Sequence, residues 1–316
     1  MRRLLPLSLI LFLVPFAGSA QFKWDFGGSI GASNYLGEIG GKELTRRDFV
    51  ADLKFSQTHI AASAFARYKV HPNISLKAEF IYGRISGADR LSTNPGRVGR
   101  NLNFRNDIFE LAFTGEFFFY EINDIGRAFR YRNDFRAYIY AGIGGMHHNP
   151  KGQLNGQGEW IALQPLGTEG QNNKPGMKPY SLWQVVVPTG AGFYFTINKE
   201  HRITYEIGWR TTFTDYLDDI STIYASDAEL NNDPLAIAMA NQSQQAFIND
   251  PTLPPGQLFS YAPGQKRGDP THNDSYIFTT VGYSYVIRGK SKFGKSRYGK
   301  YFKGNKYKKR KIRAKF

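Results

Sequence analysis

The sequence predicts an all-β protein: an eight-stranded antiparallel transmembrane β-barrel with long external loops and a disordered basic C-terminal tail. Three observations lead to this prediction. Apolar and polar residues alternate with a period of two in eight segments, and no long segment follows the helical period of 3.6. The connections between these segments alternate between shorter and longer ones. Aromatic residues make up 15% of the 316 residues, which is more than a disordered chain normally contains.

The stretch from His201 to Ser221 shows the alternation most clearly. Ile203, Tyr205, Ile207 and Trp209 share one phase, and Arg202, Thr204, Glu206 and Arg210 share the other. A strand places alternate side chains on opposite faces, so one face is apolar and the other charged. A soluble sandwich would turn the apolar face inward, whereas an outer-membrane barrel turns it toward lipid and its charged face toward the lumen. This strand by itself fits both.

The same pattern predicts seven further strands. The eight segments cover residues 23–33, 59–70, 74–86, 107–120, 135–147, 182–197, a segment that begins at His201, and 275–288. Their alternation places aromatic and aliphatic side chains on one face and Ser, Thr, Lys, Arg and Glu on the other. Period-two alternation of this kind indicates strands that are apolar on one face only.

The connections separate the barrel from its soluble alternatives. Residues 71–73 and 198–200 form shorter links and 121–134 a medium one, whereas 34–58, 87–106, 148–181 and 216–274 are long. Short turns on one side and long loops on the other are typical of transmembrane barrels. A soluble lipocalin-like barrel or a β-sandwich gives no reason for this alternation. An even number of strands places both termini on the periplasmic side.

The N-terminus resembles a secretory signal. Arg2 and Arg3 precede an apolar stretch of residues 4–16, and the small residues 17–20 offer a cleavage site. An N-terminal membrane anchor is the alternative. We therefore expect residues 1–20 to be a signal peptide and residues 21–288 to form a barrel in the outer membrane, in contact with its lipid. The chain has no cysteine, which excludes a lipid-modified cysteine after the cleavage site.

The positive charge of the chain is concentrated at its C-terminus. Residues 288–316 hold 14 of the 41 Lys and Arg residues and no acid, so the rest of the chain is close to neutral. We expect residues 289–316 to form a periplasmic tail that is disordered or bound to a partner. In an exported protein the partner would be an acidic protein, an anionic lipid or a cell-wall polymer, not nucleic acid; a solvated tail without a partner is the alternative. The candidate contact residues are Lys306, Lys308, Lys309, Arg310, Lys311 and Arg313.

Charged residues on the inward face predict a closed lumen. Lys77, Arg136 and Arg210 are placed to neutralise Glu79, Glu110, Glu116 and Glu206. Eight strands leave room for side chains only, which argues against general diffusion through the barrel.

Few residues suggest catalysis or metal binding. The chain has no G-x-S-x-G motif, and His147 and His148 fit a strand end at the barrel rim better than a catalytic site. Asp215, Asp218 and Asp219 offer oxygen ligands for calcium, but their spacing is not that of an EF-hand, so loop folding is preferred. A short helix with an Asp233 cap is predicted from Pro234. We expect no enzyme activity, no cofactor and no metal.

Five motifs resemble a known family. They are the residues Asn34-Tyr35-Leu36-Gly37 and the segments 100–107 (RNLNFRND), 142–150 (GIGGMHHNP), 164–171 (QPLGTEGQ) and 212–221 (TFTDYLDDIS). Together they resemble the PorG-like outer-membrane β-barrel family of the type IX secretion system, over about residues 24–287. The resemblance implies a barrel tied to the periplasmic ring of that machine, which is built from a lipoprotein and its partner.

Two functions are therefore expected. The first is a non-enzymatic outer-membrane barrel that anchors or assembles the type IX secretion machinery through periplasmic contacts. The alternative is an outer-membrane barrel whose external loops bind a ligand or a surface.

Overall fold

The computed structural model describes residues 24–39, 55–125, 133–243 and 261–287. The predicted signal peptide (1–20) and the basic tail (289–316), with its candidate residues Lys306 to Arg313, lie outside the described residues.

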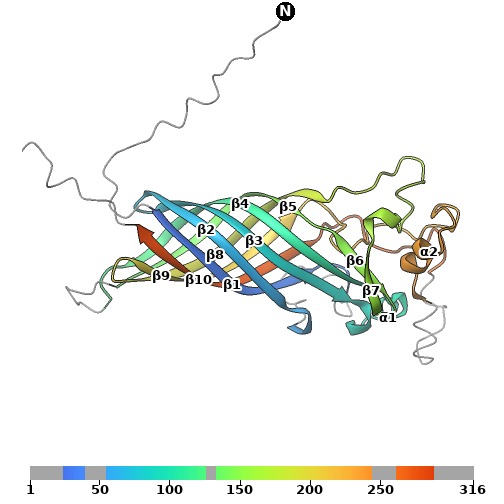
Figure 1. Cartoon of the computed structure of the whole chain (residues 1–316), viewed down its shortest axis with the longest axis horizontal. Coiled ribbons are helices and arrows are strands. Elements are labelled where there is room, and N and C mark those ends of the chain that lie inside the picture. The colour runs from blue at the N-terminus through green and yellow to red at the C-terminus, as the bar shows by residue number, and fades with distance from the viewer. Residues whose placement is uncertain (1–23, 40–54, 126–132, 244–260, 288–316) are drawn as a thin grey trace, which may run out of the picture.

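A closed antiparallel β-barrel forms the body of the protein (Figure 1). Within the described residues its eight strands are β1 (Trp24–Leu36), β2 (His59–His71), β3 (Ile74–Ala88), β4 (Asn103–Ile122), β5 (Asp134–His147), β8 (Trp183–Ile197), β9 (His201–Thr212) and β10 (Ser275–Ile287). Each strand pairs with its neighbours in sequence order, β1 pairs with β10, and β3 pairs with β4, which closes the ring. The predicted fold class and all eight predicted strands are confirmed.

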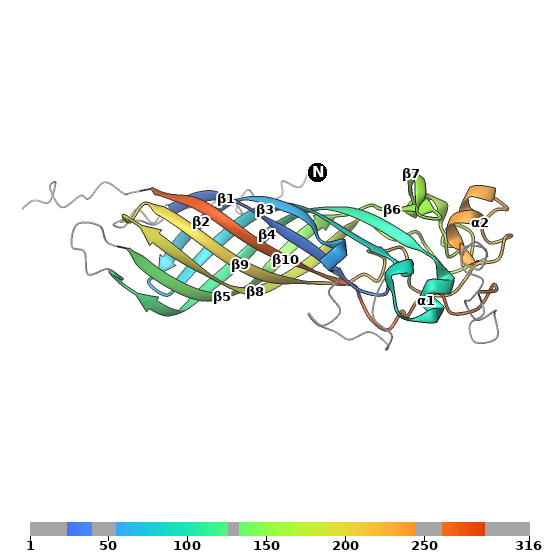
Figure 2. The same cartoon turned by 90° about the horizontal axis from the view of Figure 1, so that it is seen from below.

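The two ends of the barrel differ, as the loop lengths predicted. Tight turns join β2 to β3 and β8 to β9 at one end, where β1 also begins and β10 ends. The long connections lie at the other end, together with all of the helices labelled in the figures (Figures 1 and 2). We call the first end the turn end and the second the loop end.

The barrel wall is apolar outside and polar inside. On β9 the outward Ile207 is 41% exposed, whereas Glu206 is 7% and Arg210 2% exposed. The exposed large side chains include Trp24, Phe26, Phe80, Phe109, Leu111, Phe113, Phe117, Ile139, Ile143, Phe195, Ile203, Tyr205, Val281, Tyr283 and Tyr285. A wall of this kind is stable only against lipid, because water would face a continuous apolar band. The described helices include none that is long and apolar enough to cross a membrane.

A bulge in β4 changes the alternation near the turn end. The pairing of β4 with β5 shifts between Phe118 and Tyr120. Phe119 and Tyr120 both point outward, while Phe118 is buried inside the barrel. The extra residue thus adds an outward aromatic side chain at this rim, consistent with the role of bulges in redirecting side chains.

The loop end carries elements that the sequence analysis did not predict. Two short strands, β6 (Pro150–Leu154) and β7 (Gln157–Ala162), form a hairpin that extends the sheet beyond β4. A helix, α1 (Pro95–Arg100), is capped at its N-terminus by Asn94, whose side chain accepts hydrogen bonds from two backbone amides. Single 3₁₀ turns are η2 (Phe55–Gln57), η3 (Asp89–Leu91) and η4 (Gln164–Leu166).

The helix predicted from Pro234 is present. It is α2 (Pro234–Ala240), and the Asp233 side chain accepts a hydrogen bond from the Leu235 amide at 2.9 Å. The helix lines an open pocket of about 670 Å³ at the far side of the loop end, together with Tyr224 and Asn241.

The exposure pattern of β9 predicts how the wall tolerates charge. Ile207→Arg is expected to reduce membrane insertion, since a cation on the lipid face costs about 2–4 kcal/mol near the bilayer midplane. Phe213→Arg, just beyond the loop end of the same strand, should cost only about 0–1 kcal/mol. Heat-modifiable mobility of the folded barrel in membrane fractions measures both. Equal loss of the folded form in the two variants would contradict a lipid-facing wall.

Candidate functional site: a filled lumen and a closed loop end

Arg67 on β2 lies at the centre of the charged groups inside the barrel. Its guanidinium contacts Glu116 of β4 (2.8 Å), Asp25 of β1 (3.2 Å) and Glu206 of β9 (3.4 Å). Only 1% of the Arg67 side chain is exposed. A buried cation is tolerated when carboxylates pair with it, and here three strands supply one each.

Further ion pairs occupy the lumen on both sides of Arg67. Lys77 contacts Glu206 at 2.6 Å and Glu79 at 3.0 Å. Arg202 contacts Asp25 at 2.6 Å nearer the turn end, and Arg210 contacts Glu110 at 2.8 Å nearer the loop end. The cations Arg67, Lys77, Arg202 and Arg210 and the carboxylates Asp25, Glu79, Glu110, Glu116 and Glu206 thus link β1, β2, β3, β4 and β9 across the interior.

Aromatic side chains fill the space between these charges. The Tyr138 hydroxyl donates to Glu206 at 2.5 Å, and the Tyr276 hydroxyl donates to Glu110 at 2.8 Å. The Arg67 guanidinium carbon lies 5.4 Å from the ring centre of Tyr194 and 5.2 Å from that of Phe65. The lumen is therefore filled by side chains, as expected for a barrel of eight strands.

Six of the seven residues proposed from sequence for the lumen lie together inside the barrel: Lys77, Glu79, Glu110, Glu116, Glu206 and Arg210. Arg136 does not join them. It lies two residues from the start of β5, at the turn end, where it contacts Glu121 (2.5 Å) and the Pro72 carbonyl (3.0 Å) and its guanidinium carbon lies 5.5 Å from the ring centre of the buried Phe118.

Three further charged residues of the lumen, Asp25, Arg67 and Arg202, were not among those proposed from sequence for the ion pairs, although Arg202 was placed on the charged face of its strand. A local signal for Asp25 exists, because it stands between two outward aromatic residues, Trp24 and Phe26. A charged residue flanked in this way points into the lumen by alternation alone.

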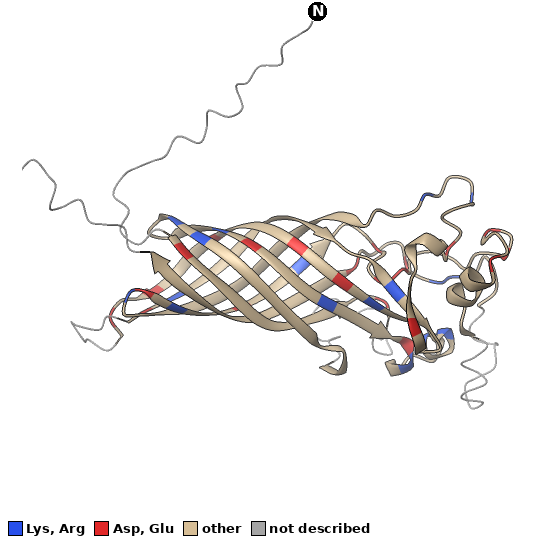
Figure 3. Ribbon diagram, in the orientation of Figure 1, with Lys and Arg blue, Asp and Glu red and all other residues tan. Residues whose placement is uncertain are grey.

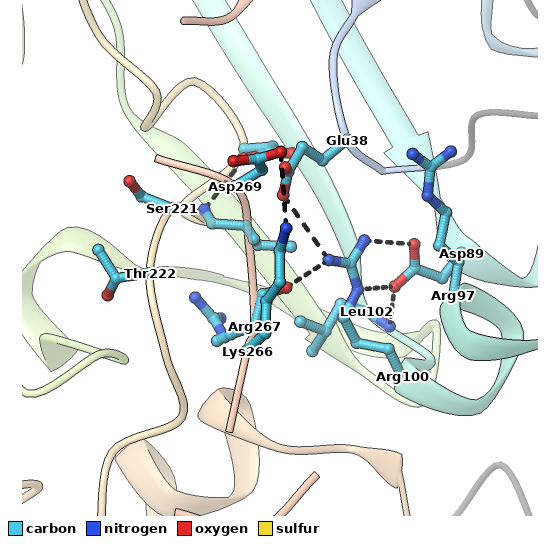
Figure 4. Close-up of polar contacts among 12 residues, drawn as sticks. Glu38, Asp89, Arg97, Arg100, Leu102, Ser221, Thr222, Lys266, Arg267 and Asp269 are labelled. Carbon is cyan, nitrogen blue, oxygen red and sulfur yellow. Dashed lines mark hydrogen bonds and ion pairs between the residues drawn. The ribbon is translucent and has the colours of Figure 1, made fainter. Parts of the chain in front are cut away.

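Charged residues also appear among the loops at the loop end (Figure 3). One group surrounds Arg100, at the end of α1 (Figure 4). Its guanidinium donates to both carboxylate oxygens of Asp89, at 2.7 and 2.9 Å, and to the Arg267 carbonyl at 2.7 Å. The β3–β4 connection is thereby attached to the segment that precedes β10.

Arg267 attaches a third connection. Its guanidinium contacts the Glu169 carboxylate at 2.9 Å and donates to the Asp219 carbonyl at 2.5 Å. Glu169 also accepts hydrogen bonds from the backbone amides of Ser221 and Thr222, at 2.9 and 3.0 Å. Both Arg267 and Glu169 are almost fully buried. The loops between β5 and β8 and between β9 and β10 are therefore held to each other.

Tyr35, near the end of β1, connects the remaining loop. Its hydroxyl lies 2.7 Å from Asp218 and 2.6 Å from Asp274, and it accepts a hydrogen bond from the Glu38 amide at 3.2 Å. Two short contacts to carboxylates require two hydrogens, and the phenol has one. A proton on one of the two carboxyl groups would satisfy both contacts. Burial raises the pKa of both Asp218 and Asp274 well above the usual range, which agrees with this count.

The five sequence motifs meet in this region, which we call the cap. Tyr35, Arg100, His148, Glu169 and Asp218 each belong to a different motif, and each is buried at the loop end. The cap thus joins all four long connections over the barrel mouth.

The histidines and aspartates considered for catalysis or calcium binding take part in this packing. His148 is fully buried and contacts the Ser181 carbonyl at 3.2 Å, whereas His147 packs outside against Trp183. Asp219 accepts from the hydroxyls of Tyr180 (2.6 Å) and Thr168. No group of three or more His, Cys, Asp or Glu residues in the described part of the chain is arranged to hold a metal ion.

The lipid-facing wall and the filled lumen define the class: an eight-stranded outer-membrane β-barrel. The chain belongs to a family described as a domain of unknown function (DUF6089), whose model matches residues 2–163. No curated protein matches the sequence.

Two solved structures resemble the chain weakly. One is Ail, the attachment invasion locus protein of Yersinia pestis, in complex with the heparin analogue sucrose octasulfate; its TM-score is 0.30 at 9% identity, over 84% of this chain and 99% of Ail. The other is the outer membrane protein OprG from Pseudomonas aeruginosa, with a TM-score of 0.32 at 7% identity, over 85% of this chain and 98% of OprG. At these scores the fold assignment rests on the strand pairing described above.

The buried pair in the cap predicts a strong effect of Arg267. Arg267→Met leaves the Glu169 carboxylate buried without its cation, which costs about 3–5 kcal/mol. We expect the loops to become sensitive to protease while the barrel stays folded. Lys266→Met is the matched control: Lys266 is 70% exposed, and its contact with Asp269 contributes less than about 1 kcal/mol. Equal protease resistance of the Arg267→Met and Lys266→Met variants would contradict a stabilising role of the Arg267–Glu169 pair.

The cap is also expected to loosen at alkaline pH. Burial raises the pKa of Asp215 to about 9 and that of Asp219 to about 6, from 3.8. A raised carboxyl pKa stabilises the folded state below about pH 4, and this contribution is lost as pH rises through those values. His148 acts oppositely: burial lowers its pKa to about 4, so its contribution is lost as pH falls from 6.5.

Hydrogen exchange of residues 214–221 tests this pH dependence. After correction for intrinsic rates, protection should fall roughly tenfold or more between pH 6 and pH 9, since one pKa unit corresponds to a factor of ten. Asp215→Asn should reduce the difference in protection between pH 6 and pH 9, whereas Asp227→Asn, at an exposed position, should not change it. The same protection at both pH values would exclude protonated carboxyl groups in the cap.

Proposed function

We propose that this protein is a non-enzymatic anchor or assembly component of the type IX protein secretion machinery, embedded in the outer membrane and contacting the machinery on the periplasmic side. The observation that carries this proposal is the lumen filled with side chains, beneath a cap whose loops are held together by hydrogen bonds and ion pairs. Side chains occupy the interior in the described part of the barrel, so we assign the function to its outer surfaces.

The turn end is the surface assigned to the periplasmic contact. The resemblance of the five motifs implies a ring built from a lipoprotein and its partner. Exposed groups at the turn end include His71, Asn73, Asn198 and Lys199, which present polar surface beyond the lipid-facing belt. The basic tail would follow directly from β10 at this same end, adding a polycation with many weak contacts to an acidic partner.

Co-purification from outer membranes after mild cross-linking tests the anchor role. The full chain is expected to retain the two ring proteins, and rising salt should weaken the contact steeply, because charges beyond about 8 Å are screened at physiological salt. Truncation after Arg288 keeps β10 and should leave a heat-modifiable barrel that loses most of the salt-sensitive binding. Failure of the full chain to retain any ring protein would refute the anchor role; unchanged binding by the truncated chain would move the contact to the turns.

Cysteine labelling tests the orientation on which this proposal depends. Gly156→Cys and Asn241→Cys lie exposed at the loop end, whereas Asn73→Cys and Asn198→Cys lie exposed at the turn end. The first pair should react with a membrane-impermeant reagent on intact cells, and the second only after the outer membrane is opened. The reverse result would place the turns and both termini outside the cell.

A further inference from the structure

The outer face of the wall carries basic residues just above the lipid-facing belt at the loop end. On β3, Arg84 pairs with Asp107 of β4 at 2.6 Å, and the Tyr82 hydroxyl donates to the same carboxylate at 3.0 Å. Two residues before Asp107 on β4, and nearer the loop end, is Arg105, which lies directly opposite Lys151 of β6 in the strand register. Residues opposite each other in an antiparallel pair share one face of the sheet, so both cations face outward.

The opposition of Arg105 and Lys151 is unfavourable by itself. Like charges directly opposite each other on paired strands destabilise the pairing. Neither residue makes an ion pair with any side chain in the described part of the protein, and the Nε of Arg105 is buried without a hydrogen-bond partner there. The nearest carboxylate along β4, Asp107, is already occupied by Arg84 and Tyr82. Within the described residues, Arg105 and Lys151 therefore carry positive charge that no ion pair neutralises, and Asp107 offsets it only at longer range.

An aromatic residue fixes the position of this charge. Trp160 of β7 lies on the same outward face, and the guanidinium carbon of Arg105 lies 4.6 Å from its ring centre. This stacking holds the flat face of the guanidinium, and since the Nε is buried, the two terminal nitrogens are the donors left for a ligand. Arg105 is thus pre-oriented, and its ordering entropy is already spent before any anion arrives.

The depth of the cluster matches a lipid headgroup layer. The opposed pair Tyr82 and Phe109 belongs to the lipid-facing belt. Arg84 and Asp107 form the next outward pair, about 7 Å farther along the strands, and Arg105 follows by a similar step. Strand tilt of about 40° shortens these steps along the membrane normal to roughly 5 Å each. A headgroup region about 5–7 Å deep that begins beside Arg84 and Asp107, the first charged outward pair above the belt, would include Arg105.

We propose that Arg105, Lys151 and Trp160 form a binding site for the phosphate group of an anionic glycolipid in the outer leaflet. The edge of the Arg105 guanidinium supplies paired donors that match phosphate oxygens, and Lys151 adds a point charge from the adjacent strand. The acyl chains of the same lipid would lie against the belt below, next to Phe109 and Leu111. Continuity with the lipid-facing wall selects a membrane lipid as the occupant over a soluble anion.

The test measures lipid retained by the purified full-length chain. The probe is lipid A with two phosphates, incorporated with phosphatidylcholine into detergent micelles, and compared with the same lipid A after enzymatic removal of its phosphates. The immobilised barrel is washed, and the retained glycolipid is quantified by its fatty acids. The expected result is at least about fivefold greater retention of the phosphorylated form, with little competition by excess inorganic phosphate. Equal retention of the two forms overturns the proposal without any variant.

Charge-matched variants then locate the site. Arg105→Gln combined with Lys151→Gln should abolish the preference for phosphorylated lipid A, whereas Lys178→Gln combined with Lys266→Gln removes the same charge from exposed loop positions and should keep it. Lys151→Gln alone, in case the double variant does not fold, should reduce the preference at least about threefold. Retention of the preference by both site variants, or its loss in the control, overturns the assignment. Complete competition by free phosphate would show a soluble-anion site and overturn the lipid assignment.

Discussion

The rest of the structure depends on the burial of Arg67 in a lumen too narrow for water-filled space. Its three carboxylate partners come from β1, β4 and β9, so the charge can be satisfied only when these strands hold one register with β2. A slip of one residue would turn Arg67 toward lipid and an apolar neighbour inward. The loss of one partner from a buried pair costs about 3–5 kcal/mol. The ion pairs thus specify the register at least as much as they stabilise the fold.

An apolar layer separates this network from the cap. Phe104, Ile108, Met146, Val186 and Phe278 are buried together near the loop end. The Arg210–Glu110 pair lies on the lumen side of this layer, and the Tyr35 contacts with Asp218 and Asp274 lie on the loop side. Two polar layers with an apolar layer between them close the loop end more completely than loops alone would, and they explain why the long connections are ordered where they meet the barrel.

The fold was predictable because the alternation of apolar and polar residues within each strand is enough to identify that strand and its two faces. Outward aromatic residues and inward charges alternate within β9 and β4, so faces follow from the sequence without any knowledge of neighbours. The partners of each charge were less predictable, since they depend on the stagger of strands around the ring; this is why Arg136 was placed in the network and Arg67 was not. The β6–β7 hairpin carried a usable signal that was overlooked, the turn Asn155-Gly156, which has positive φ at both residues.

The cap could not be derived from local patterns. Tyr35 and Asp274 are separated by 239 positions, and Arg100 reaches the Arg267 carbonyl across 167. Each half of such a contact looks like an ordinary polar loop residue. The five motifs do contain residues of the cap. They were singled out because they resemble a known family, and nothing in the sequence showed that these residues lie close together.

The position of the motif residues in the cap limits what the resemblance can say about periplasmic contacts. Tyr35, Arg100, His148, Glu169 and Asp218 of the motifs lie in the buried cap, at the opposite end of the barrel from the described turns. A changed Asp218 or Arg100 would leave a buried partner unsatisfied, so these residues affect the closure of the mouth. The packing of buried residues in the cap does not constrain the residues at the turn end. The proposed secretion role requires an accessible surface, and in the described part of the chain that surface is the exposed turn end and not the buried cap.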